Sequence, residues 1–384
     1  MENREAFFAL VRAGLWEKVN ENDLPALQAC DLSGANLNDN LFEGLDWGEI
    51  LKLAEEQSVV GLVAAGVEKF TVCGIPLTEK LTLLGKCQLI EQQNLVMNQF
   101  VADLVMRLRK AYALLLKGQG VAQCYERPLW RTCGDVDLFL SDENYNRAKQ
   151  ILLPIAKNIG KEYYYTKHLG MTIESWSIEL HGYLRCGLSK RIDQVLDEIR
   201  QDVLLGGNVR SWMNGNTQVF LPSADNDTVY IFTHILSHFY KGGIGLRQLC
   251  DWCRLLWSYR NEIDVAKLEE RLRKMQLVTE WKTFGAFAVE RLGMPVEAMP
   301  LYDGSSRWKR KAQRIEEFIM MSGNFGHNRD SSYWVKYPYL IRKAFSMKRR
   351  VGDLVCHARI FPLDSLRFFP TIVGHGLRSA AKGE

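Results

Sequence analysis

The hydrophobic pattern of this chain changes its period twice, and that change limits the fold more than any other feature. Up to about residue 110 apolar residues recur at helical spacing, as in DWGEILKLAEEQSVVGLVAAGVEKF. Shorter strand-like runs fill residues 111–222, and the helical period returns from Ser223 onwards. We therefore expect an α+β fold with a central sheet, divided into a helical region (1–110), an α/β core (111–222) and a helical region with a basic tail (223–384).

Four strands and two helices are expected inside the core segment, followed by a hairpin. The runs YALLLKG, GDVDLFL, KHLGMTIES and WSIELHGYL predict the strands. Ser141 predicts the N-terminal cap of a helix over SDENYNRAKQILLPIAKNIG, and SKRIDQVLDEIRQDVLL predicts a second helix. The Asn-Gly pair in VRSWMNGNTQVFL predicts a β-hairpin. In the first region Asp46 predicts a helix cap, and a long helix is expected over about Lys86–Arg109.

The composition is typical of a soluble protein. Hydrophobic residues make up 47% of the 384 positions, enough for a sizeable core. No apolar run approaches the roughly 18 residues that cross a bilayer, and the start MENREAFFAL does not resemble a signal peptide. The nine cysteines lack the spacing of a disulfide framework, so we expect a reduced, cytoplasmic protein.

Positive charge is concentrated near the C-terminal end. Between residues 335 and 384 ten lysines and arginines face three acidic residues, whereas the rest of the chain carries 39 basic and 42 acidic residues. Such a tail could contact nucleic acid or an anionic surface, or it could be a solvated face. Four phenylalanines interleave with the charges and leave both interpretations open, since they could stack on bases or form the buried side of a helix: Phe345, Phe361, Phe368 and Phe369.

Three carboxylates in strand-like runs are the main candidates for chemistry. Asp135 and Asp137 are two positions apart in GDVDLFL, so they share one face of the strand at about 7 Å. Glu179 in SIELHGY is a third acid in a strand pattern, and His181 shares its face. Carboxylate oxygens suit Mg²⁺ or Mn²⁺, although a solvated strand end would also explain the aspartate pair.

A glycine-containing loop precedes the aspartates. In LLLKGQG, Gly118 and Gly120 allow close approach of the backbone to a phosphate, and Lys117 adds a positive charge. Arg131, four residues ahead of Asp135, could bind the same phosphates with two hydrogen bonds. Each motif is weak alone, but their order within one strand-rich segment predicts a phosphate-and-metal site.

The segment LLLKGQG…RTCGDVDLFL…SIELH resembles the polymerase-β-like nucleotidyltransferase superfamily, and most closely its uncharacterised nucleotidyltransferase family. The resemblance implies that Asp135, Asp137 and Glu179 bind metal and are catalytic. It also implies that the nucleotide is bound by Lys117, Gly118, Gly120 and Arg131. The sequence departs from the superfamily at Gln119, where a second small residue is common.

The resemblance implies transfer of NMP from an NTP, with ATP as the expected donor, to an acceptor hydroxyl by a two-metal mechanism with Mg²⁺ or Mn²⁺. Glu179 would help to deprotonate the hydroxyl, with His181 as the alternative base. The acceptor could be a small molecule, a tRNA or a protein. The alternative hypothesis, favoured by Gln119, is a catalytically degenerate module that binds a nucleotide or a partner.

Three other spacings in the C-terminal helical region have simpler interpretations. His234 and His238 are four apart, as in some zinc sites, but no third ligand is evident, so we expect core or site-lining residues. The C-x-x-C run CDWC lies in a helical pattern and is expected to pack in the core. Arg247 and Asp251 are four apart, which predicts an ion pair on one helix face. As a second interpretation, the resemblance implies that this pair also faces the nucleotide cleft.

Overall fold

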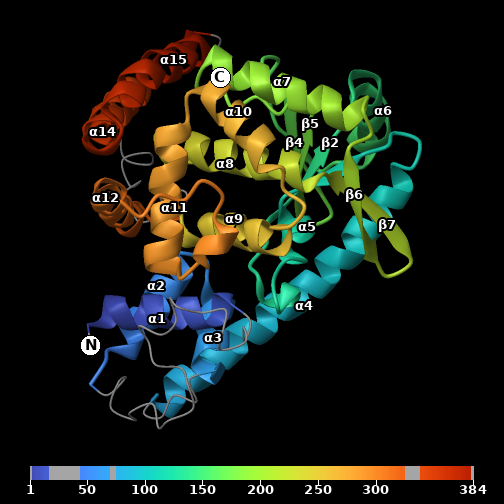
Figure 1. The fold of residues 1–384 in the computed structure, drawn as a ribbon. Helices are drawn as coiled ribbons and strands as arrows, with labels where there is room; N and C mark the ends of the chain where they lie inside the picture. Colours follow the sequence, from blue (N-terminus) through green and yellow to red (C-terminus); the bar gives the residue numbers. More distant parts are fainter. Residues whose placement is uncertain (1, 17–43, 70–74, 325–337, 382–384) are drawn as a thin grey trace.

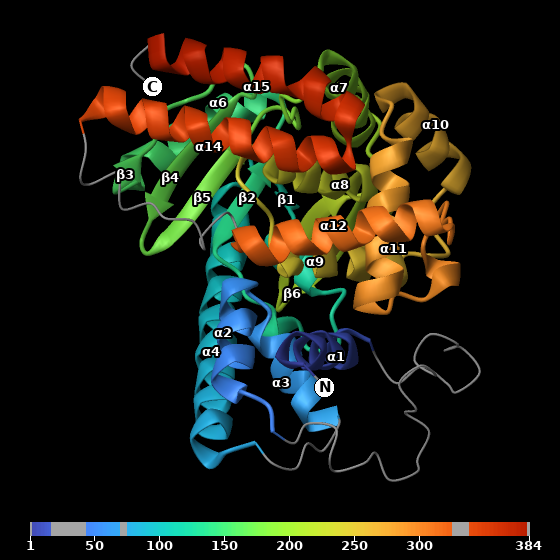
Figure 2. The same cartoon turned by 90° about the vertical axis from the view of Figure 1, so that its left-hand side faces the viewer.

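The computed structural model describes residues 2–16, 44–69, 75–324 and 338–381. A five-stranded sheet lies at one end of the molecule and a group of N-terminal helices at the other (Figure 1). A long helix runs between them, and the C-terminal helices cover the side of the molecule away from it (Figure 2). The expected α+β class with a central sheet is confirmed.

Four helices form the N-terminal part: α1 (Asn3–Leu15), α2 (Trp47–Glu56), α3 (Val60–Lys69) and α4 (Leu77–Arg107). Asp46 caps α2 as predicted, because its side chain accepts a hydrogen bond from the backbone N–H of Glu49. The stretch of helical period around it forms two helices, which are separated at Ser58, a residue with a positive φ of 55°. The long helix was predicted from about Lys86 but begins nine residues earlier.

The central sheet has the strand order β1-β2-β5-β4-β3. Its strands are β1 (Leu114–Leu116), β2 (Asp135–Phe139), β3 (Asn158–Ile159), β4 (His168–Ile173) and β5 (Trp176–His181). All neighbouring pairs are antiparallel except β2 and β5, which are parallel. In this parallel pair, Asp137 of β2 lies directly beside Glu179 of β5.

Two helices and a hairpin complete the core segment. Ser141 caps α6 (Asp142–Leu152) as predicted, and α7 (Lys190–Leu204) follows β5. The predicted extension of α6 to Gly160 is wrong: Pro154 lacks an N–H and clashes with the preceding turn, so the helix gives way to a short 3₁₀ turn and β3. The predicted hairpin is confirmed as β6 (Val209–Asn214) and β7 (Thr217–Pro222), which pack against α4 and β1.

Helices resume after the hairpin: α8 (Ala224–Lys241), α9 (Leu246–Ser258), α10 (Val265–Met275), α11 (Val278–Leu292), α12 (Ser306–Ser322), α14 (Tyr339–Ile360) and α15 (Pro362–Ala381). Figure 2 shows α14 and α15 side by side, and both contact α8. Phe361 and Phe368 are buried there, which confirms the buried-side interpretation for these two aromatic residues. In the described ranges no helix is both long and apolar enough to span a membrane.

Candidate active site

The three predicted carboxylates come together on one face of the sheet. Asp135 and Asp137 lie on β2, and Asp137 is in direct register with Glu179 on the parallel neighbour β5. Because side chains alternate along a strand, all three point to the same side. Carboxylate oxygens of the three residues lie within 4.8 Å of one another. This donor set of hard oxygen atoms matches the preference of Mg²⁺ and Mn²⁺.

The carboxylates of the acidic group repel one another. The neighbouring Asp137 charge, followed by burial, raises the pKa of Asp135. The ammonium group of Lys117 lies next to the acidic group, with its Nζ 3.2 Å from Asp137 Oδ2. Burial alone would lower the pKa of Lys117, but the Asp137 charge and the other acids outweigh it and raise this pKa. A divalent ion between the carboxylates would relieve their repulsion, so the residues fit the metal that the resemblance implies.

Two histidines continue the polar face beyond the carboxylates. His181 Nε2 lies 2.8 Å from Asp137 Oδ1 and 3.5 Å from Glu179 Oε2, and His168 Nε2 lies 3.1 Å from Glu179 Oε2. Burial disfavours the charged ring of His181, but its bonds to Asp137 and Glu179 raise its pKa. Burial would raise the pKa of Glu179, yet its close contacts with His168 and His181 lower it. His181 therefore faces the carboxylates as a proton donor.

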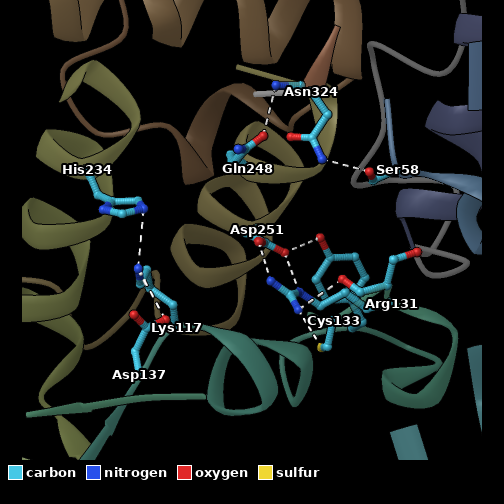
Figure 3. A network of polar contacts seen from close by, with 12 residues as sticks. Ser58, Lys117, Arg131, Cys133, Asp137, His234, Gln248, Asp251 and Asn324 are labelled. Atoms are coloured by element: carbon cyan, nitrogen blue, oxygen red, sulfur yellow. Dashed lines mark hydrogen bonds and ion pairs between the residues drawn. The ribbon is translucent and has the colours of Figure 1, made fainter. Parts of the chain in front are cut away.

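The loop after β1 places Lys117 at the mouth of the site. Lys117 and Gly118 both have a positive φ, of 47° and 46°, and α5 (Gly118–Ala122) begins directly after the lysine. A Cβ on Gly118 would meet nothing closer than the Asp135 carbonyl at 3.4 Å, so the loop lies against β2. The Lys117 Nζ also lies 3.3 Å from His234 Nε2 on α8, as Figure 3 shows. Burial, followed by the Lys117 charge, lowers the pKa of His234, which can therefore accept this bond as a neutral ring.

The two other positions of the loop face the interior. A Cβ on Gly120 would lie 2.0 Å from Leu221 Cδ2, so this glycine lets the hairpin pack closely against the loop. The Gln119 side chain is buried and donates from Nε2 to Asn94 Oδ1 on α4 at 3.0 Å. The departure from the superfamily pattern thus ties the loop to the long helix. A nucleotide-binding role of Gly120 stays a prediction.

Arg131 is engaged in a buried ion pair rather than left open towards the carboxylates. Its Nε and Nη2 donate to the two carboxylate oxygens of Asp251 on α9 at 2.7 and 2.6 Å (Figure 3). Tyr125 donates its hydroxyl to the same carboxylate. The predicted pairing of Arg247 with Asp251 is wrong, because Arg131 takes its place. The assignment of Arg131 to the phosphates stays a prediction.

A small open cleft lies beside the acidic group. Its floor is formed by Lys117, Gly118, Asp135 and Asp137 of the core, and Arg131 with its partner Asp251 also lines it. The opposite wall consists of residues from α8 and α9: Ile231, His234, Ile235, Arg247 and Gln248. The place of Arg247 at the cleft agrees with the second interpretation drawn from the sequence. Ile231, Ile235 and Gln248 were missed, because nothing in a helical pattern marks which face lies over a distant strand.

The two remaining motifs of this region lie beside the cleft and in the core, respectively. The Nε2 atoms of His234 and His238 lie 3.0 Å apart, and His234 lines the cleft, as expected for a site-lining pair. Cys250 and Cys253 are fully buried free thiols, which confirms that the C-x-x-C run packs in the core.

The family comparison agrees with this geometry and extends beyond the core segment. Comparison with curated proteins and with solved structures finds no match. A family model described as "Uncharacterised nucleotidyltransferase" matches residues 43–293, from α2 to the end of α11, and so includes the acidic strands and both helices of the cleft wall. The chain is therefore a member of this uncharacterised nucleotidyltransferase family.

Proposed function

We propose that the protein transfers NMP from an NTP, with ATP as the expected donor, to the hydroxyl group of an acceptor in an Mg²⁺- or Mn²⁺-dependent reaction. The observation that carries the proposal is the meeting of Asp135, Asp137 and Glu179 within 4.8 Å on adjacent strands. A divalent ion bound there would neutralise charge on the triphosphate and favour ionisation of the acceptor hydroxyl. Membership of the nucleotidyltransferase family supports the same class of reaction.

The chain's own groups would orient the triphosphate in the cleft. Lys117 would exchange its contact with Asp137 for a phosphate oxygen, while His234 keeps the ammonium group at the mouth of the cleft. Arg247 lines the same cleft, and its buried Nε has no hydrogen-bond partner among the described residues, so it is available for a second phosphate contact. The backbone of Gly118 can approach a phosphate closely because it carries no side chain.

Glu179 and His181 would act on the acceptor side of the group. Glu179 is the outermost of the three carboxylates towards β4, and the two histidine contacts keep it ionised. An ionised carboxylate at this position can accept the proton of an attacking hydroxyl. In the metal-free site, the contacts of His181 with Asp137 and Glu179 hold both carboxylates in place.

The proposal is tested by release of pyrophosphate from each NTP in the presence of Mg²⁺ and a cell extract as the source of acceptor. We expect Asp137→Asn to lower turnover by at least ~10³-fold, because the substitution removes one metal ligand and its charge. Asp103→Asn serves as the control, because this aspartate is exposed on the surface of α4 and is not part of the acidic group. Circular dichroism would verify that both variants are folded.

The alternative of a catalytically degenerate module gives a different result in the same experiment. Calorimetry with each NTP would then detect binding, while no pyrophosphate release and no labelled acceptor would accompany it. Equal pyrophosphate release by the wild type and the Asp137→Asn variant would remove Asp137 from the reaction and contradict the proposal.

A further inference from the structure

A second group of metal-ligand atoms lies next to the acidic group. His168 on β4 is directly opposite His181 on β5 in the antiparallel register, and Glu179 is two positions before His181 on the same strand. The three side chains therefore leave the same face of the sheet. Their ligand atoms lie within 4.8 Å of one another, and Glu179 belongs to both groups.

We propose that His168, Glu179 and His181 bind a transition-metal ion of the Zn²⁺ or Mn²⁺ class, distinct from the ion held by the aspartates. The Nε2 atoms of His168 and His181 lie 3.1 and 3.5 Å from Glu179 Oε2. Two ligands at 2.0–2.1 Å from a tetrahedral ion are about 3.3 Å apart, so these separations match a common ion.

Hydrogen bonding does not account for the position of His168. Its Nε2 is buried and has no hydrogen-bond partner of suitable geometry in the described part of the chain, although Glu179 Oε2 is 3.1 Å away. Two ligands of one metal ion also lie close together without pointing at each other, so a shared ion would account for this arrangement. His181 at present contacts Asp137 at 2.8 Å and would exchange that contact for the metal.

The chemistry of the donor atoms separates the two neighbouring sites. Two imidazoles and one carboxylate favour Zn²⁺ and other transition metals, whereas the aspartate group offers only oxygen atoms and suits Mg²⁺. Since Glu179 contributes to both groups, it would bridge the two ions, as carboxylates do in two-metal sites.

The face above the shared glutamate is open. Gly170 on β4 is directly opposite Glu179, and a Cβ on Gly170 would meet nothing within 4 Å. With only three protein ligands, the ion would retain a coordination position for water or for an oxygen of the acceptor. The assignment of that position to the acceptor rests on the proposed transferase function, whereas binding of the ion does not.

The test is a calorimetric titration of the metal-free full-length protein with Zn²⁺ alone, without nucleotide. We expect one Zn²⁺ to bind per wild-type chain, the His168→Gln variant to lose this binding, and the Asp135→Asn variant to retain it. His238→Ala is the matched control. The His234–His238 pair also brings two imidazoles together, but within the described part of the chain no third histidine, cysteine or carboxylate lies close enough to complete a metal site.

X-ray absorption at the zinc edge of the wild-type protein provides a measurement that does not depend on a variant being folded. Scattering from two imidazoles in the first shell would support the proposal, and a shell of oxygen atoms alone would overturn it. Retention of Zn²⁺ by the His168→Gln variant would also overturn it, whether or not His238→Ala binds Zn²⁺. The zinc titration contains no NTP, so its result does not depend on transferase activity. Absence of activity in the pyrophosphate assay would contradict the proposed function but not the binding of Zn²⁺.

Discussion

The contact between Arg131 and Asp251 is among the most buried ion pairs of the described chain, and it shows what a motif residue can do besides binding substrate. Both side chains are almost fully buried, and the guanidinium donates to both carboxylate oxygens. Burial alone would lower the pKa of Arg131, but the Asp251 charge outweighs it, so the pair stays ionised. The sequence predicted Arg131 at the phosphates and did not reveal this ion pair, because Asp251 is 120 residues away and leaves no local signal.

We predict that Arg131→Met lowers the free energy of unfolding by about 3–5 kcal/mol, because the substitution leaves the Asp251 carboxylate buried without its charged partner. Urea denaturation followed by circular dichroism measures this change. The double variant Arg131→Met/Asp251→Leu should regain most of the loss, since it removes both charges. Equal instability of the single and double variants would contradict the role of the ion pair.

At the level of elements, the sequence predicted the capped helix starts and the hairpin turn better than helix crossings or the start of α4, which has no side-chain cap. The caps Asp46 and Ser141 were recognised because side-chain capping acts within a few residues. The crossing of α1 and α3 was not, because it depends on contact between distant segments. Gly14 and Gly66 form this crossing: a Cβ on either would lie about 2 Å from a backbone oxygen of the other helix.

Close approach of these two helices leads to a prediction about glycine substitutions. Gly66→Ala should lower the free energy of unfolding by about 1–3 kcal/mol, because its Cβ would lie 2.1 Å from the Leu10 carbonyl oxygen and would push α3 away from α1. Gly85→Ala in α4 is the matched control, since nothing lies within 4 Å of its Cβ, and it should raise stability by about 0.5–1 kcal/mol. Thermal unfolding of both variants would test this, and a stabilising effect at Gly66 would argue against tight contact.

For the whole molecule, the sequence predicted the floor of the site but only part of its wall, namely His234 and Arg247. Asp135, Asp137 and Glu179 could be placed together because strand alternation and one pairing of neighbouring strands suffice. The wall is formed by α8 and α9, and an amphipathic pattern gives only the buried face of a helix, not the element that it covers. The family match includes these helices but ends at residue 293, so α12, α14 and α15 lie outside it.

The contact between α11 and α15 joins the matched segment to the C-terminal helices through buried acids. Glu280 of α11 is fully buried, and burial, followed by the charge of Asp364 on α15, raises its pKa well above the ordinary value. A carboxyl whose pKa is higher in the folded than in the unfolded state contributes stability at low pH. That contribution is lost as the pH rises from 4.5 through the folded-state pKa.

We therefore predict that the wild-type protein loses stability between about pH 5 and about pH 8 through this carboxyl, and that Glu280→Gln loses less. The glutamine keeps the shape of the side chain without a charge, so the variant should be the more stable protein at the higher pH and similar to wild type at the lower one. Denaturation at both pH values measures the difference, with Glu317→Gln on the exposed face of α12 as the control. If Glu280→Gln shows the same pH dependence of stability as wild type and Glu317→Gln, the prediction is contradicted. Glu280 would then not be protonated where it lies against α15 in the folded protein.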